Sequence, residues 1–320
     1  FIAEGEIIME TKYLVTTREM FQKAYQEHYA IGAFNINHLE LIQAVVEAAG
    51  DLRSPVILQA SSFTAKYTDL EYLVQAADLA AKIAGIPVAM HLDHGESLEV
   101  AKQFIDAGFT SVMIDGSHYP YEENVAITKS VCDYAHAHGV TVEGELGTIS
   151  GIEDGVSSDK GLYTDPQQAL DFVHRTGVDS LAVAVGTSHG AYKFKPGQKP
   201  KLRFDILQEI EQVLAGLPIV LHGASSVNQE DVKTINEFGG SIQKAIGIPE
   251  EMLAEAAKMA VCKVNVDTDL RLAMTAAVRK TLSENPAVID TRKYIGAGRS
   301  LVKERVAYKM ENILHSAHRY

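Results

Sequence analysis

The sequence is poor in cysteine and in positive charge. Its 320 residues hold two cysteines, Cys132 and Cys262, and neither belongs to a Cys-x-x-Cys pair. This excludes a disulfide framework and a cysteine-based zinc site, so we expect both thiols to be small residues on a helix and a strand. Lys and Arg number 29 against 42 Asp and Glu, a formal net charge of −13. A general nucleic-acid surface and an anionic-membrane binder are therefore excluded, and an anionic ligand must be held by a local cluster of donors.

Long apolar runs and linker-like stretches are also missing. No apolar run approaches about 20 residues, so no membrane-spanning helix is predicted. No Pro-, Gly- and Ser-rich segment divides the chain, so we expect one domain over residues 1–320, with a helical extension over 285–320. Residues 1–15 lack a signal-peptide pattern and are a partly non-native lead-in if Met9 is the natural start. These features predict a cytoplasmic enzyme.

Short apolar, β-branched runs alternate with segments of helical spacing. Leu98, Ala101 and Ile105, for example, follow the i, i+3, i+7 pattern of a helix. The runs predicted as strands are 30–37, 55–61, 87–95, 111–117, 141–147, 180–186, 218–223 and 262–268. A Gly-x-Gly-x-x-Gly loop, which would favour an open nucleotide-binding sheet, is absent. We therefore predict an α/β fold, a (β/α)8 TIM barrel with an extra helix over 16–28 that closes its bottom.

Polar residues gather at the carboxyl end of every predicted strand. The polar residues at these strand ends are Asn35 and Asn37, Ser61, Asp93 and His94, Asp115 and Ser117, Glu143 and Glu145, Thr187 to His189, His222 with Ser225 and Ser226, and Asn265 with Asp267 and Thr268. Five of the eight predicted strands, by contrast, start with an apolar residue or proline, and the other three start with Ser or Thr. Because catalytic groups of such barrels lie on the loops at the carboxyl ends of the strands, this pattern predicts a functional mouth.

Three histidines fall just past the predicted third, sixth and seventh strands. They are His94, His189 and His222, and all three are followed directly by glycine. A single strand-end histidine is more often a hydrogen-bonded structural residue. Three imidazoles converging on one rim instead predict a catalytic zinc, which takes three protein ligands and keeps one open position. His91 and His118 are candidates for partners that orient a ligand or a carboxylate.

Two further segments carry signs of anion binding and of a closing loop. The run from Gly223 to Ser226 and the pair Asp267 and Thr268 are predicted where the last two strands turn into helices, the usual phosphate position in this fold. The alternative for the first run is an ordinary helix cap. Arg271, expected one turn into the eighth helix, is a candidate bidentate donor to a second phosphate, with a solvated helix charge as the alternative. The glycine-rich, acidic segment 148–161 is either a loop that closes over the mouth with a carboxylate or a surface loop without catalytic duty.

Six ordered blocks give the chain a resemblance to a known family. They are GAFNIN at 32–37, HLDHG at 91–95, EGELG at 143–147, GTSHG at 186–190, LHGASS at 221–226 and NVDTD at 265–269. From about residue 15 to about 306 the chain resembles the class II, metal-dependent fructose-1,6-bisphosphate aldolases. The resemblance implies reversible cleavage of fructose 1,6-bisphosphate to dihydroxyacetone phosphate and glyceraldehyde 3-phosphate through an enediolate stabilised by zinc.

The resemblance also implies roles for individual residues. The implied zinc ligands are His94, His189 and His222, with Glu145 as an alternative ligand. Asp93 would exchange a proton with the C4 hydroxyl, and Glu153 would move the proton on the dihydroxyacetone phosphate carbon. One zinc ion per chain, a monovalent cation (Na⁺ or K⁺) and a homodimer or higher homo-oligomer complete the implied assembly.

The same resemblance assigns the substrate contacts. Those implied for the phosphate and hydroxyls of the triose half are Gly190, Lys193, Gly223, Ser225, Asp267 and Thr268. Asn265 would lie near the carbonyl, and Asn35 belongs to the same substrate site. Ser61 and Arg271 would meet the phosphate at the far end, with Arg292 arriving from a dimer partner.

Three other functions remain open. Tagatose-1,6-bisphosphate aldolases share nearly every block, but they tend to carry a small residue where this chain has Asp267, which favours fructose. A zinc hydrolase on the same barrel would need no pair of phosphate sites. A non-catalytic sugar-phosphate binder would need neither Asp93 nor Glu153.

Overall fold

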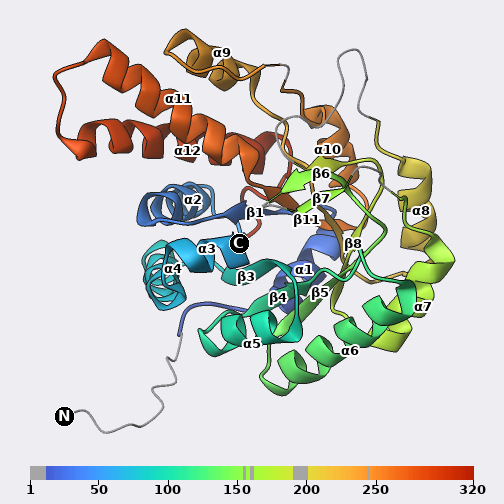
Figure 1. The fold of residues 1–320 in the computed structure, drawn as a ribbon. Helices are drawn as coiled ribbons and strands as arrows, with labels where there is room; N and C mark the ends of the chain where they lie inside the picture. The colour runs from blue at the N-terminus through green and yellow to red at the C-terminus, as the bar shows by residue number, and fades with distance from the viewer. Residues whose placement is uncertain (1–11, 154–155, 159–161, 190–200, 244) are drawn as a thin grey trace, which may run out of the picture.

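Eight parallel strands form a closed barrel in the computed structural model, which describes residues 12–153, 156–158, 162–189, 201–243 and 245–320 (Figure 1). The strands are β1 (Ile31–Asn35), β2 (Val56–Ala60), β3 (Val88–Gly95), β4 (Ser111–Ile114), β5 (Thr141–Leu146), β8 (Ser180–Val183), β10 (Ile219–Leu221) and β11 (Val261–Val266). β1 closes the barrel between β2 and β11, and every neighbouring pair is parallel. The predicted (β/α)8 barrel is confirmed, and each of the eight predicted runs contains or overlaps one of its strands.

Helices surround the barrel, as parallel strands require. They are α1 (Thr17–Glu27), α2 (Leu39–Asp51), α3 (Ser62–Tyr67), α4 (Leu70–Ala84), α5 (Leu98–Asp106), α6 (Tyr121–Ala137), α7 (Pro166–Thr176), α8 (Phe204–Val213), α9 (Gln229–Glu237), α10 (Glu250–Ala256), α11 (Thr268–Glu284) and α12 (Thr291–Asn312). The last two pack side by side, next to α2 (Figure 1). In the part of the chain that the structure describes, no helix has the length and apolar character needed to span a bilayer.

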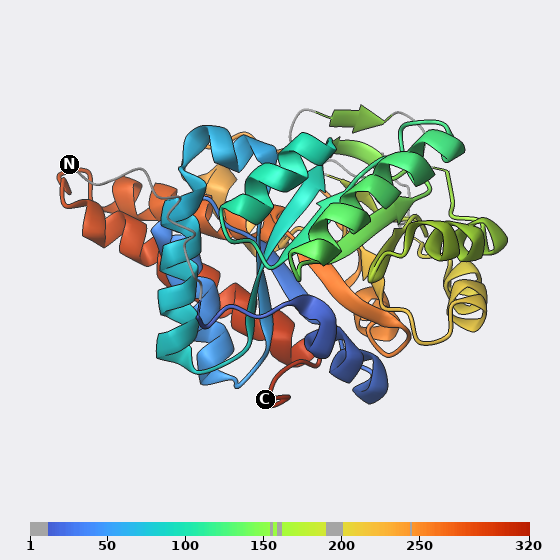
Figure 2. The same ribbon diagram turned by 90° about the horizontal axis from the view of Figure 1, so that it is seen from below.

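The bottom of the barrel is closed by α1, as predicted for 16–28. Its buried residues Met20, Phe21 and Ala24 pack against Ile31 and Cys262 from two neighbouring strands. Figure 2 shows this helix at the end of the barrel opposite the small strands described below. The polar strand ends are therefore left to form the other end, where the site lies.

Local signals in the sequence set several helix ends. The side chain of Asp165 accepts the N–H of Gln168, and Pro166 occupies the first turn of α7, where its missing N–H costs nothing. The helix ends at Gly177, whose φ of 77° suits a residue without a Cβ. Cys132 on α6 and Cys262 on β11 are buried free thiols, as expected.

Two local expectations are wrong. The predicted loop over 148–161 contains strands β6 (Ser150–Glu153) and β7 (Val156–Ser158), which form a three-stranded sheet with β9 (Ser188–His189). The run from Gly223 to Ser226 does not begin a helix, because α9 starts only at Gln229. An irregular segment follows β10 instead, and Val227 within it has a φ of 57°, a conformation incompatible with an α-helix.

Candidate active site

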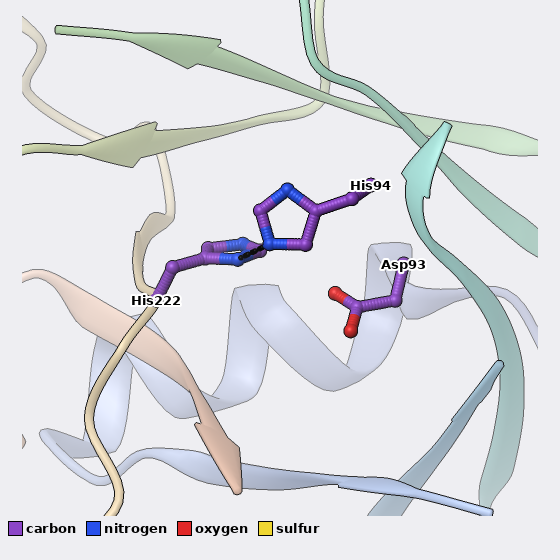
Figure 3. Close-up of side chains that lie close together, drawn as sticks. All are labelled: Asp93, His94 and His222. Carbon is purple, nitrogen blue, oxygen red and sulfur yellow. Dashed lines mark hydrogen bonds between the residues drawn. The ribbon is translucent and has the colours of Figure 1, made fainter. Parts of the chain in front are cut away.

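Asp93, His94 and His222 meet at the mouth of the barrel. Figure 3 shows the two imidazole rings beside one another with the Asp93 carboxylate adjacent. Nδ1 of His222 lies 2.9 Å from Nε2 of His94, and the rings meet edge to face at 76°. Each of the three residues offers one ligand atom, and these atoms lie within 4.8 Å of one another. Residues 128 positions apart are thus brought into one group.

An irregularity in β3 lets two consecutive residues serve the same site. Neighbouring residues of a regular strand point to opposite faces. Here the register between β3 and β4 shifts between Leu92 and Gly95, and His94 adopts a φ of 48°. Such a kink re-aims a side chain, and it brings His94 to the mouth together with Asp93.

Two carboxylates fix the protonation of the histidine pair. His94 Nδ1 lies 3.1 Å from Asp115 Oδ2, and His222 Nε2 lies 2.7 Å from Glu143 Oε1. Since a carboxylate only accepts hydrogen bonds, each of these nitrogens carries the ring proton. The amide of Asn265 approaches the other nitrogen of His222, Nδ1, at 3.1 Å and so treats it as an acceptor. The lone pairs of His94 Nε2 and His222 Nδ1 therefore point toward the same place.

The charges around His94 and His222 favour a positive charge between His94 Nε2 and His222 Nδ1. Burial opposes a charged His94, but the charge of Asp93 and the hydrogen bond and charge of Asp115 outweigh it and raise the pKa of His94 to about 10. Burial is the main reason that the pKa of His222 lies well below its usual value, with the charge of His94 adding to the effect. A site with these properties can be filled by a proton on His94 or by a metal ion bound to both rings.

Asp93 is held as a carboxylate by a ring of amides. Oδ2 accepts hydrogen bonds from Asn35 Nδ2 at 2.8 Å and from Gln59 Nε2 at 3.2 Å, while Oδ1 accepts one from Asn265 Nδ2 at 2.9 Å. Burial raises the pKa of Asp93, but the neighbouring His94, His222 and Lys263 and the hydrogen bond from Asn35 lower it by more, so the net shift is downward. The carboxylate is therefore ionised and oriented before any ligand arrives.

The pKa of Glu145 is shifted in the opposite direction from that of Asp93. Glu145 is 2% exposed, and among the described residues Oε2 has no hydrogen-bond partner. Burial, reinforced by the charge of Asp115, raises its pKa well above the usual value. Glu145 Oε2 lies 4.0 Å from His94 Nδ1, and Glu145 forms a second group of ligand atoms with His94 and Asp115. Glu145 therefore lies on the Nδ1 side of His94, outside the group formed by Asp93, His94 and His222.

The segment after β10 approaches the mouth closely. Gly223 has a φ of 59°, and a Cβ at this position would lie 2.6 Å from the backbone of Ser188, so only glycine fits. Ser225 follows and is 4% exposed. Directly after the neighbouring β11, Asp267 precedes Thr268, the first residue of α11, and binds the guanidinium of Arg271 through contacts of 2.7 and 2.8 Å. These residues form a polar rim beside the histidines.

Comparison with known proteins shows the family to which the chain belongs. The fructose-bisphosphate aldolase class-II family matches residues 15–319. The chain belongs to this family. It is 50% identical to the fructose-bisphosphate aldolase of Treponema pallidum, over 96% of this chain and 97% of that protein, and 48% identical to that of Giardia intestinalis, over 95% and 94%. The crystal structure of the YdjI aldolase from Escherichia coli K12 superposes with a TM-score of 0.77 at 31% identity, covering 95% of this chain and 98% of that one. The family expected from the six blocks is confirmed.

Other residues expected in the site of this class II aldolase are only partly described. His189 lies on β9 and Glu153 on β6, and their side chains fall outside the described part of the chain, as do Gly190 and Lys193. Ser61, 5% exposed, precedes α3 at the end of β2. Arg292 lies in the first turn of α12, and its exposed side chain binds Asp290 of the same chain.

Sequence reasoning missed the polar residues beneath the aldolase site. Gln59 binds both Asn35 and Asp93, and it is a fully buried amide in an otherwise apolar strand. Lys263, also fully buried, donates hydrogen bonds to Glu143 at 2.8 Å and to His91 at 3.2 Å. The sequence signal for Gln59 and Lys263 was a polar residue inside a run of strand-forming apolar residues. Such a side chain needs hydrogen-bond partners when it is buried.

Proposed function

We propose that this class II aldolase reversibly cleaves fructose 1,6-bisphosphate to dihydroxyacetone phosphate and glyceraldehyde 3-phosphate, with one zinc ion per chain. The observation that carries the proposal is the pair of facing lone pairs on His94 and His222, each backed by a carboxylate and flanked by Asp93. Zinc binds neutral imidazoles whose second nitrogen donates to a carboxylate, and this donor set fits that requirement. His189 would supply the third ligand and Glu145 an alternative one.

Asp93 would act at the C4 hydroxyl. As an ionised carboxylate held by three amides it can accept the hydroxyl proton, while the C3–C4 bond breaks and C4 becomes the aldehyde carbon. The electron pair remains on C3 next to the ketone, where a bound zinc ion would supply the Lewis acid that stabilises the negative charge. Glu153 would deliver the proton that completes dihydroxyacetone phosphate. Asn265, which already donates to Asp93, would orient the carbonyl half.

The rim residues would bind the substrate's two phosphates and its hydroxyls. The expected contacts of the triose half are Gly190, Lys193, Gly223, Ser225, Asp267 and Thr268. Ser61 and Arg271, with Arg292 of a second chain, would bind the other phosphate. The ion pair between Arg271 and Asp267 supports the assignment of these contacts to the two ends of the substrate. It places a guanidinium that can bind a phosphate directly beside a carboxylate that can accept a hydrogen bond from a substrate hydroxyl. Phosphate contacts at both ends hold a flexible sugar in position for cleavage.

Asp267 is also the reason to prefer fructose over tagatose bisphosphate as the substrate. The two sugars differ in the configuration at C4, and a buried acceptor matched to one hydroxyl arrangement discriminates against the other. The supporting observation is that Asp267 lies at the rim with only 13% of its side chain exposed. A monovalent cation, a homodimer or higher homo-oligomer and a cytoplasmic location remain expectations that follow from the family resemblance.

Rates on the two sugar bisphosphates, measured alongside the metal content, test the proposal. We expect faster cleavage of fructose 1,6-bisphosphate, loss of activity on treatment with a chelator and recovery with zinc. Faster cleavage of tagatose 1,6-bisphosphate would reassign the substrate. Activity that survives complete metal removal would refute the zinc proposal, and release of inorganic phosphate without triose phosphates would indicate a hydrolase.

A further inference from the structure

We propose that Lys309 and Asp269 are positioning residues that hold the segment 223–227 in its phosphate-binding conformation. The inference rests on the proposed function, which assigns Gly223 and Ser225 to the triose phosphate. It extends that site to two residues that would not touch substrate, one of them on the C-terminal helix α12.

Asp269 satisfies the backbone at the point where the segment is most strained. Its Oδ1 accepts the N–H of Val227 at 2.7 Å, and its Oδ2 accepts the N–H of Ser226 at 3.0 Å. Val227 has a φ of 57°, which is unfavourable for a β-branched residue and persists only where the surroundings enforce it. Asp269 is 1% exposed, so little water can replace these hydrogen bonds. The carboxylate thus fixes the backbone directly after Ser225.

Lys309 supplies the charge that allows this carboxylate to be buried. Its Nζ lies 2.8 Å from Asp269 Oδ2 and donates to the hydroxyl of Ser226 at 2.7 Å. The Lys309 side chain is 6% exposed, and Glu250 Oε1 lies 4.0 Å from Nζ. A buried carboxylate that loses its cation either takes up a proton or turns away. Removing Lys309 would therefore loosen both hydrogen bonds of Asp269 to the segment.

The other side of the segment is already fixed by close packing. Ile248 donates its N–H to the carbonyl of Ser225 at 3.2 Å, and a Cβ on Gly247 would lie 2.4 Å from that same carbonyl oxygen. Ser225 is thus held between the chain at 247–248 and the group formed by Asp269 and Lys309. Its hydroxyl and the neighbouring N–H groups can face a phosphate only while both sides are in place.

Kinetics of the zinc-loaded enzyme in the condensation direction test this inference. We expect Lys309→Met to raise KM for dihydroxyacetone phosphate about tenfold with kcat changed less than about threefold, because the phosphate is bound equally in the ground and transition states. KM for glyceraldehyde 3-phosphate and the zinc content should not change. Lys309→Arg, which keeps the charge, should restore most of the affinity. Unchanged KM for dihydroxyacetone phosphate in Lys309→Met would overturn the proposal.

Two further variants separate positioning from folding. Lys303→Met removes another lysine of α12, paired with Asp51 at a half-exposed position, and should behave as wild type. Ser226→Ala removes the hydroxyl that accepts from Lys309 and that also lies within hydrogen-bond distance of Asp269 and Glu250. It keeps the Lys309–Asp269 ion pair, so it should fold and raise KM for dihydroxyacetone phosphate by a few-fold. If Lys309→Met does not fold, an unchanged KM in Ser226→Ala overturns the inference by itself. Failure of the wild-type enzyme to form sugar bisphosphate would instead refute the proposed function.

Discussion

Lys263 Nζ lies 2.8 Å from Glu143 Oε2 inside the barrel, and both side chains are at most 1% exposed. Glu143 uses its other oxygen to accept the Nε2 proton of His222. The lysine also donates to His91, whose pKa is well below its usual value because of burial and the lysine charge. His91 is therefore neutral, and its second nitrogen bonds Ser111. A chain of hydrogen bonds thus connects the barrel interior to the histidine pair.

Replacing Lys263 by methionine should strongly destabilise the protein. Methionine has a similar length, so the packing is largely kept, but Glu143 is left as a buried charge without its cation. Removing one partner of a buried ion pair typically costs about 3–5 kcal/mol. Urea unfolding of the metal-free protein should show a loss of this size. Lys303→Met, which breaks an exposed pair between α12 and Asp51 of α2, should change the free energy of unfolding by less than about 1 kcal/mol. A loss below about 1 kcal/mol in the Lys263 variant would contradict this account.

Asp93→Ala should separate metal binding from proton transfer. The lone pairs that face each other belong to His94 and His222, so zinc content should stay close to that of the wild type. Loss of a general acid–base group should reduce turnover by at least about 100-fold. Asp93→Asn keeps the shape of the side chain and should be equally impaired, since an amide cannot accept the proton. Turnover near the wild-type value in either variant would remove Asp93 from the mechanism.

Strand positions were well predicted because they depend on local composition. A run such as 55–61 is apolar, β-branched and bounded by proline, and the structure places β2 (Val56–Ala60) inside it. Polar residues at the strand ends predicted the mouth, since all eight strands of the barrel point the same way. The proximity of His94 and His222 followed from topology alone, without knowledge of any side-chain conformation.

Features that depend on tertiary contacts could not be predicted. The left-handed backbone at Val227 is stabilised by Asp269, 42 positions away, and no local sequence pattern near Ser226 indicates this conformation. A helix was therefore expected one turn or more too early. The strands at 150–153 and 188–189 are short, and pairing between distant segments defines them. The bulge that turns His94 toward Asp93 depends likewise on the register against β4.

His222→Ala should abolish stable metal binding. This change removes one of the two nitrogens whose lone pairs converge, and it leaves Glu143 without the N–H that it accepts. Elemental analysis after dialysis should find well under one zinc ion per chain, with turnover lost in parallel. His174→Ala, at an outward position near the end of α7, is a matched histidine control and should keep its metal. Full zinc occupancy in the His222 variant would show that the metal lies elsewhere.

Cys132 and Cys262 should resist thiol reagents as long as the protein is folded. They are 1% and 0% exposed, and burial raises the pKa of each thiol to about 12. The thiolate is the reactive form, so at pH 8 the folded protein should present almost none of it, while unfolding returns each pKa to about 8.5. Titration with a disulfide reagent should therefore detect no rapid reaction in buffer and two thiols per chain in guanidinium chloride. Because neither cysteine belongs to the proposed site, the metal-free and zinc-loaded forms should be equally protected, and rapid labelling of either form would show that the barrel opens at α6 or β11.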